Sequence, residues 1–149
     1  MDADNKVPPS AAWLGALGAL PFIGLSGAAP FLDSAPRMFV VHALVAYGAV
    51  ILSFLGGVHW GLAIGSRSNA DHQALRTRLI VSVIPSLAAW VALLFPEKTG
   101  LLILAAAIAA MLWMDLRATR AGNAPPWYPK LRIPLTCVVV AALLFGASA

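Results

Sequence analysis

Residues 38–65 read MFVVHALVAYGAVILSFLGGVHWGLAIG and contain no Asp, Glu, Lys or Arg. An α-helix over this stretch would be about 42 Å long at about 1.5 Å per residue, whereas the hydrocarbon core of a bilayer is about 30 Å thick. A helix of that length tilts, or extends beyond the bilayer surface. The stretch therefore predicts a transmembrane helix.

Stretches without charge recur at residues 7–32, 79–96, 99–114 and 133–149. They predict further spans at residues 11–32, 79–95, 99–116 and 133–148, and the span at residues 99–116 includes Asp115 near its end. Of the 149 residues, 60% are hydrophobic and 11% are charged, and the mean hydropathy is +0.84. Soluble domains carry about 25% charged residues. We therefore expect residues 1–149 to form a single all-α transmembrane domain, a five-helix bundle.

The basic residues divide unevenly between the two faces that five alternating spans define. Arg37 and Lys98 lie on one face, and the other eight basic residues lie on the opposite face, namely Lys6, Arg67, Arg76, Arg78, Arg117, Arg120, Lys130 and Arg132. Because positive residues are retained on the cytoplasmic side, this predicts a cytoplasmic N-terminus and an external C-terminus. The formal net charge of +4 thus indicates topology, and we expect no nucleic-acid partner.

The N-terminal residues and the single cysteine lead to two further expectations. Residues 1–6 carry two acids and one base, unlike the basic n-region of a secretory signal, so we expect the first span to be retained. Cys137 has no second cysteine with which to form an internal disulfide, and no metal or redox cysteine motif is present. The sequence identifies no cofactor.

Gly57, Gly61 and Gly65 repeat every four residues and would form one smooth stripe on a helix. Helices in lipid associate by close packing, which small residues permit. We expect the stripe to pack against another helix, and the alanine-rich span at residues 99–116 is the natural partner. The alternative is a ligand crevice over exposed glycine.

His59 and Trp60 are the most suggestive polar residues within a span. An ionisable side chain at this depth faces protein or a water-filled cavity. His59 could ligate a metal or haem, relay a proton or bind a ligand carbonyl, or it could simply join two helices by a hydrogen bond. Trp60 could anchor the helix at the headgroup level or form a ligand wall.

Asp115, Arg132 and Arg78 are predicted to lie at the same membrane face as His59, on different spans. We expect Asp115 to approach Arg132 within salt-bridge or one-water distance, with His59 and Trp60 lining the same crevice. A solvated interfacial carboxylate is the alternative. Trp127 and Tyr128 fit either an interfacial anchor or an aromatic flap over this polar cluster.

Two motifs carry a resemblance to a known family. Residues 47–61, YGAVILSFLGGVHWG, and residues 127–136, WYPKLRIPLT, resemble the motifs of the membrane family called domain of unknown function 3429, whose mitochondrial relatives are called transmembrane protein 69. The resemblance implies a multi-pass protein of the bacterial inner membrane. It implies no activity, so the motif residues are positions of interest and not catalytic assignments.

Two functions remain open. The favoured one is a non-enzymatic bundle that binds a membrane lipid or a lipid-like molecule such as a quinone, or that assists a respiratory complex as its membrane-protein partner. The alternative is a small proton-coupled transporter or channel using His59 and Asp115, against which the odd number of spans and the scarcity of mid-membrane charge weigh. An intramembrane enzyme is disfavoured, because no Ser/His pair, His-x-x-Glu-His motif or pair of acids at useful spacing occurs.

Overall fold

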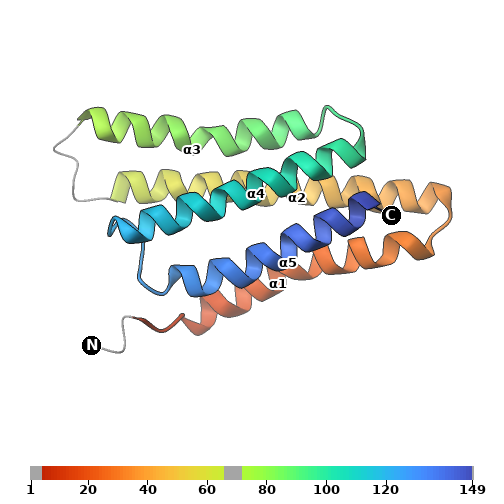
Figure 1. Cartoon of the computed structure of the whole chain (residues 1–149), viewed down its shortest axis with the longest axis horizontal. Coiled ribbons are helices and arrows are strands. Elements are labelled where there is room, and N and C mark those ends of the chain that lie inside the picture. The colour runs from red at the N-terminus through yellow and green to blue at the C-terminus, as the bar shows by residue number, and fades with distance from the viewer. Residues whose placement is uncertain (1–4, 66–71, 149) are drawn as a thin grey trace.

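The structure is a computed structural model that describes residues 5–65 and 72–148, and its described part is helical without strands. Each of five helices is long and apolar enough to cross a membrane, which confirms the all-α five-helix bundle. Their bounds are α1 Pro9–Ala28, α2 Ser34–Gly65, α3 His72–Ala92, α4 Glu97–Arg120 and α5 Tyr128–Ser148, with a short 3₁₀ helix η2 Ala29–Phe31 after α1 (Figure 1).

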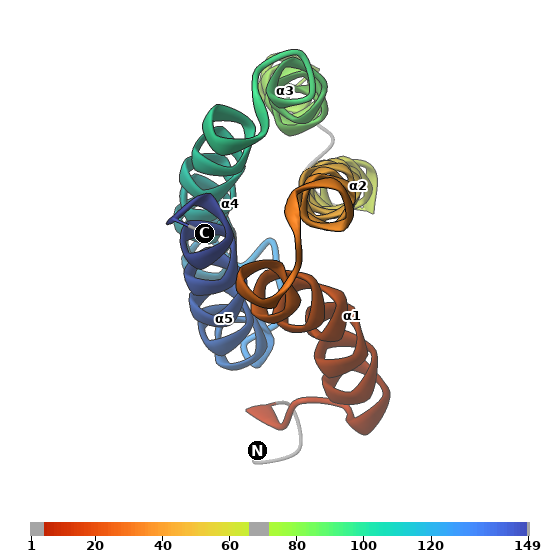
Figure 2. The same cartoon turned by 90° about the vertical axis from the view of Figure 1, so that its right-hand side faces the viewer.

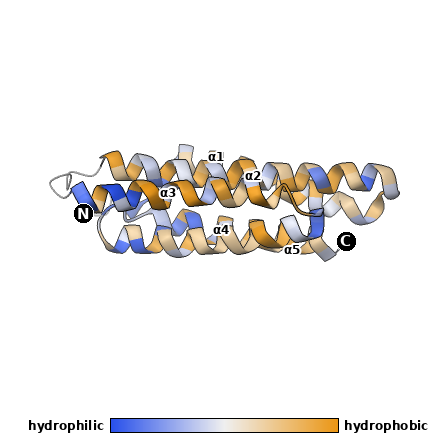
Figure 3. Ribbon diagram, turned by 90° about the horizontal axis from the view of Figure 1, so that it is seen from above, coloured by the Kyte–Doolittle hydropathy of each residue, from blue (hydrophilic) through white to orange (hydrophobic). Residues whose placement is uncertain are grey.

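Successive helices run in opposite directions, so the start of α5 lies at the same end of the molecule as the end of α4 (Figure 1). Hydrophilic residues gather towards the two ends and hydrophobic residues cover the middle (Figure 3). One end, called here the basic end, holds all described basic residues except Arg37 and Lys98, namely Lys6, Arg76, Arg78, Arg117, Arg120, Lys130 and Arg132. Arg67 lies outside the described residues. The predicted unequal division of charge between the two ends is thus retained, whereas the direction of the bundle in a membrane stays a prediction.

The helices are arranged with α2 and α4 between α3 on one side and the α1–α5 pair on the other (Figure 2). The most extensive contacts join α2 to α3, α4 to α5 and α1 to α5. Close packing of apolar side chains holds these helices together, because lipid removes the hydrophobic driving force for their association. The largest fully buried apolar side chains of the described residues are Phe22, Leu44, Leu52, Leu101, Leu104, Ile108 and Leu143.

The glycine that brings α2 close to a neighbour is Gly56. A Cβ atom at Gly56 would lie 2.7 Å from the backbone oxygen of Ser82 on α3. Gly57, Gly61 and Gly65 are exposed, and no atom lies within 4 Å of the Cβ position at any of them. The prediction that another helix of the bundle covers their stripe is therefore wrong. One residue turns an α-helix by about 100°, so the packed side of α2 carries Gly56 and not its neighbour.

The ends of the helices also differ from the ends of the predicted spans. α3 begins at His72 and not near Leu79, and it ends at Ala92, before the predicted limit at Phe95. α5 begins at Tyr128 and not near Ile133, so Pro134 lies inside the helix. The absence of charge marks the segment within lipid, whereas helices continue through basic residues into the interface.

Candidate functional site

Asp115 on α4 is the centre of a buried polar cluster. Its side chain is 1% exposed, although it lies near the basic end of the bundle. Arg132 on α5 donates from Nε to Oδ2 of Asp115 over 2.6 Å, and His59 on α2 places Nε2 at 2.8 Å from Oδ1. The predicted approach of Asp115 and Arg132 is confirmed, and three helices meet at one carboxylate.

The turn after α4 explains why Asp115 and Arg132 meet. Gly122 has a φ of 72°, in the left-handed region that glycine adopts without a steric penalty. Its N–H donates to the carbonyl of Thr119 over 3.0 Å, and the N–H of Asn123 donates to the carbonyl of Ala118 over 2.9 Å. These bonds close the end of α4 and reverse the chain. The start of α5 consequently packs beside the last turns of α4.

Because Asp115 is buried, the stability of its carboxylate depends on the groups that bind it. An ionised carboxylate away from water is stable only when it is paired and hydrogen-bonded, and Asp115 has one partner on each oxygen. A carboxylate accepts and cannot donate, so the Nε2–H of His59 is the donor. The ring is thereby held with Nε2 towards Asp115, and Nδ1 forms no hydrogen bond to a residue in the described part of the chain.

The two aromatic residues at the start of α5 take different positions. Tyr128 begins α5 and lies within electrostatic range of Asp115 and Arg132, so it is near the cluster. Trp127 packs edge-on against Tyr128, with the ring centroids 6.0 Å apart and an interplanar angle of 78°. Tyr128 thus lies near the cluster with Trp127 against it, and the choice between an interfacial anchor and an aromatic flap stays a prediction.

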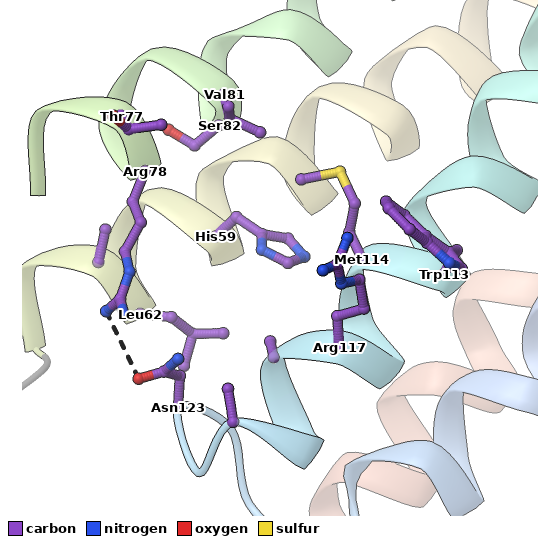
Figure 4. Close-up of a pocket in the computed structure, with 13 residues that line it drawn as sticks. His59, Leu62, Thr77, Arg78, Val81, Ser82, Trp113, Met114, Arg117 and Asn123 are labelled. Atoms are coloured by element: carbon purple, nitrogen blue, oxygen red, sulfur yellow. Dashed lines mark hydrogen bonds between the residues drawn. The ribbon is translucent and has the colours of Figure 1, made fainter. Parts of the chain in front are cut away.

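A cavity of about 500 Å³ lies between α2, α3 and α4, beside the Asp115 cluster. His59 is the member of the cluster that lines this cavity. Asp115, which binds His59, and Arg132, which binds Asp115, do not line it. Figure 4 shows the His59 ring in the middle of the lining side chains. The main other lining residues are Leu62, Thr77, Arg78, Val81, Ser82, Trp113, Met114, Arg117 and Asn123. His59 is thus the link between the cavity and the buried ion pair.

Two arginines are held at this cavity by contacts with other lining residues. Arg78 donates from Nη1 to Oδ1 of Asn123 over 3.4 Å. The guanidinium carbon of Arg117 lies 4.5 Å from the ring centroid of Trp113, in a cation–π contact. The sequence contains a sign of the second contact, because Trp113 and Arg117 are four residues apart and therefore share a face of α4.

Trp60 does not join the cavity. It is 44% exposed, and Trp113 from α4 supplies the tryptophan of the lining. The expectation that Trp60 lines the crevice with His59 is therefore wrong, because neighbouring residues point about 100° apart on a helix. The sequence did not predict three of the lining residues, Trp113, Thr77 and Ser82. Their positions depend on how α3 and α4 are rotated relative to α2.

Comparisons with known proteins agree with this architecture. Residues 7–148 match the family described as "Protein of unknown function (DUF3429)". The chain is 40% identical over 147 residues to Transmembrane protein 69 of Xenopus tropicalis, covering 94% of this chain and 54% of that protein. It is 30% identical over 125 residues to Transmembrane protein 69 of Mus musculus, covering 78% of this chain and 50% of that protein.

The chain spans about half the length of these curated relatives. No solved structure matches it. The family match extends over nearly all of the chain and includes both sequence motifs, so the resemblance found in the sequence is confirmed. This multi-pass membrane protein belongs to the DUF3429 family.

Proposed function

We propose that the protein is a non-enzymatic membrane bundle that binds a lipid-like amphiphile in the cavity between α2, α3 and α4. The observation that carries this proposal is the mixed lining of the cavity. Leu62, Val81 and Met114 provide apolar surface, whereas His59 and Arg117 provide polar groups. A volume of about 500 Å³ lies within the range of about 300–1,000 Å³ that small-ligand sites occupy.

The position of the cavity at the basic end supports an amphiphile as its ligand. Arginines and an exposed tryptophan, Trp113, are typical of the headgroup level of a bilayer. With the basic end on the cytoplasmic side, the cavity would open at the inner leaflet of the bacterial inner membrane. A ligand there could keep its headgroup among polar side chains and its hydrocarbon part in lipid.

The Asp115 cluster would serve this site by positioning His59. Two bonds to Asp115 connect the imidazole rigidly to Arg132 on another helix. This leaves Nδ1 as the ring nitrogen for a ligand, as an acceptor in the neutral ring and as a donor in the protonated ring. A ring held in advance loses less entropy when it binds a ligand.

Native mass spectrometry of the detergent-purified protein tests the proposal. Ala118→Leu would extend a larger side chain into the cavity, because Ala118 lines it. Ala110→Leu is the matched control, since Ala110 is exposed on the same helix away from the cavity. We expect retained amphiphile in the natural protein and in the control, and loss of it from Ala118→Leu. Equal retention by all three proteins would place the ligand elsewhere.

A proton-coupled transporter or channel is the second candidate, and the 2.8 Å contact between His59 and Asp115 favours it. That contact joins the cavity to a buried carboxylate, which is the kind of connection a proton relay needs. Proteoliposomes with an internal pH dye test this candidate. A proton flux that His59→Ala abolishes supports transport, and absence of flux in the natural protein excludes it.

A further inference from the structure

We infer that the ligand of the cavity carries a negatively charged headgroup, and that Arg117 and His59 bind it. This inference rests on the proposed function and adds the chemical class of the ligand. The shared chemistry is an anionic oxygen group, a phosphate or carboxylate, at the polar end of an amphiphile.

The distribution of charge around the cavity is the first step. The described lining residues include Arg78, Arg117 and His59, and none of the described lining residues is Asp or Glu. Among the described acids, Asp33 and Glu97 lie at the end opposite the basic end, and Asp115 lies near the cavity. Both oxygens of Asp115 already accept bonds, one from His59 and one from Arg132. No described acid neutralises Arg117, which forms no ion pair within residues 5–65 and 72–148.

The geometry of Arg117 is the second step. Its guanidinium carbon lies over the Trp113 ring at 4.5 Å from the centroid, and none of the described acids forms an ion pair with its N–H donors. Figure 4 shows the His59 ring between Arg78 on one side and Arg117 on the other. Donors from α2, α3 and α4 therefore surround one space. A planar group with several fixed donors suits a phosphate or carboxylate.

The apolar wall of the cavity is the third step, because it favours an amphiphile over a free anion as the ligand. Leu62, Val81 and Met114 line the same cavity as the arginines. A small hydrated anion would gain nothing from this wall, whereas the chain of a lipid would cover it. A neutral ligand such as a quinone would cover the wall too, but it would offer no charged partner to the Arg117 guanidinium.

Competition between two lipids with identical acyl chains tests the inference. The delipidated protein is mixed with equal amounts of phosphatidylglycerol, which is anionic, and phosphatidylcholine, which is zwitterionic, and bound lipid is counted by native mass spectrometry. We expect phosphatidylglycerol to be preferred by about tenfold, the fold-change that one charge-assisted hydrogen bond provides. Arg117→Gln should bring the ratio close to one. Arg120→Gln is the matched control and should retain the preference, since Arg120 is exposed near the same end of α4 and does not line the cavity.

Each outcome has a distinct meaning. Equal binding of the two lipids by the natural protein, or a preference that survives in Arg117→Gln, overturns the inference and leaves the proposed amphiphile site intact. Absence of any bound lipid overturns the proposed function and the inference with it. Addition of excess inorganic phosphate shows which source of negative charge the site binds. If inorganic phosphate displaces phosphatidylglycerol, the site binds free phosphate. If it does not, the site binds the headgroup of a lipid.

Discussion

His59 and Asp115 are 56 positions apart in the chain, yet Nε2 of the histidine lies 2.8 Å from Oδ1 of the aspartate. The histidine side chain is 12% exposed and lines a cavity, whereas the aspartate is 1% exposed and paired with Arg132. A buried ion pair thus holds a side chain that reaches a cavity. In this arrangement the two residues have different roles: Asp115 is structural, whereas His59 can contact a ligand.

Asp115→Asn should destabilise the protein strongly. The substitution keeps the shape of the side chain but leaves the buried guanidinium of Arg132 without its counter-charge, at a cost of about 3–5 kcal/mol. Thermal unfolding in detergent measures the effect as a lower Tm. The control is Asp33→Asn, because Asp33 is an exposed acid at the other end, and its Tm should be unchanged. An unaltered Tm in Asp115→Asn would show that the ion pair does not stabilise the bundle.

His59→Ala should separate stability from ligand binding. The pair of Asp115 with Arg132 remains, so the loss of stability should be about 1.5–3 kcal/mol, the contribution of one hydrogen bond to a charged group. Retained amphiphile, counted by native mass spectrometry, should decrease markedly. His42→Ala, which removes an exposed histidine far from the cavity, should change neither quantity. If the role of His59 were purely structural, the Tm would also decrease, but the variant would retain the full amount of ligand.

Gly56→Ala and Gly57→Ala should differ although the residues are adjacent. A Cβ atom at position 56 would lie 2.7 Å from the Ser82 carbonyl, so α2 and α3 must separate, at a cost of about 1–3 kcal/mol. A Cβ atom at position 57 contacts no atom within 4 Å. Comparison of the two Tm values tests this packing, and a larger decrease for Gly57→Ala would contradict it.

Reporter fusions test the orientation in the membrane. The basic residues at one end of the bundle predict that this end is cytoplasmic. Alkaline phosphatase, which is active outside the cytoplasm, should be active when fused at the C-terminus and inactive when fused after Ala121. The reverse pattern, or activity at both positions, is incompatible with the predicted topology.

The sequence predicted the pairing in the cluster because charge alternation assigns helix ends to faces. Asp115 ends one span and Arg132 begins the next, so their approach follows from the topology alone. His59 followed in the same way from its depth on α2. Tyr128 could be placed near the cluster only as one of two alternatives, because a motif shows which residues are adjacent but not which of them turns inward.

The walls of the cavity could not be predicted in this way, because they depend on the rotation of each helix about its axis. α2 packs through Gly56, one residue away from the stripe that the glycine spacing favoured. Neighbouring residues of a helix point about 100° apart, so Trp60 faces away from the cavity that His59 lines. Trp113 of α4 lines the cavity instead. Single-helix spacing identifies a stripe of small residues, but packing against the other helices decides whether it is used.

The most direct test of the amphiphile site is an experimental density map of the protein purified with its native lipids. The account predicts elongated density between α2, α3 and α4, with a polar end within hydrogen-bond distance, about 2.7–3.2 Å, of Arg117 or of Nδ1 of His59. Lipid density confined to the outer surface of the bundle, with the space beside His59 filled by protein side chains or by water alone, would contradict it.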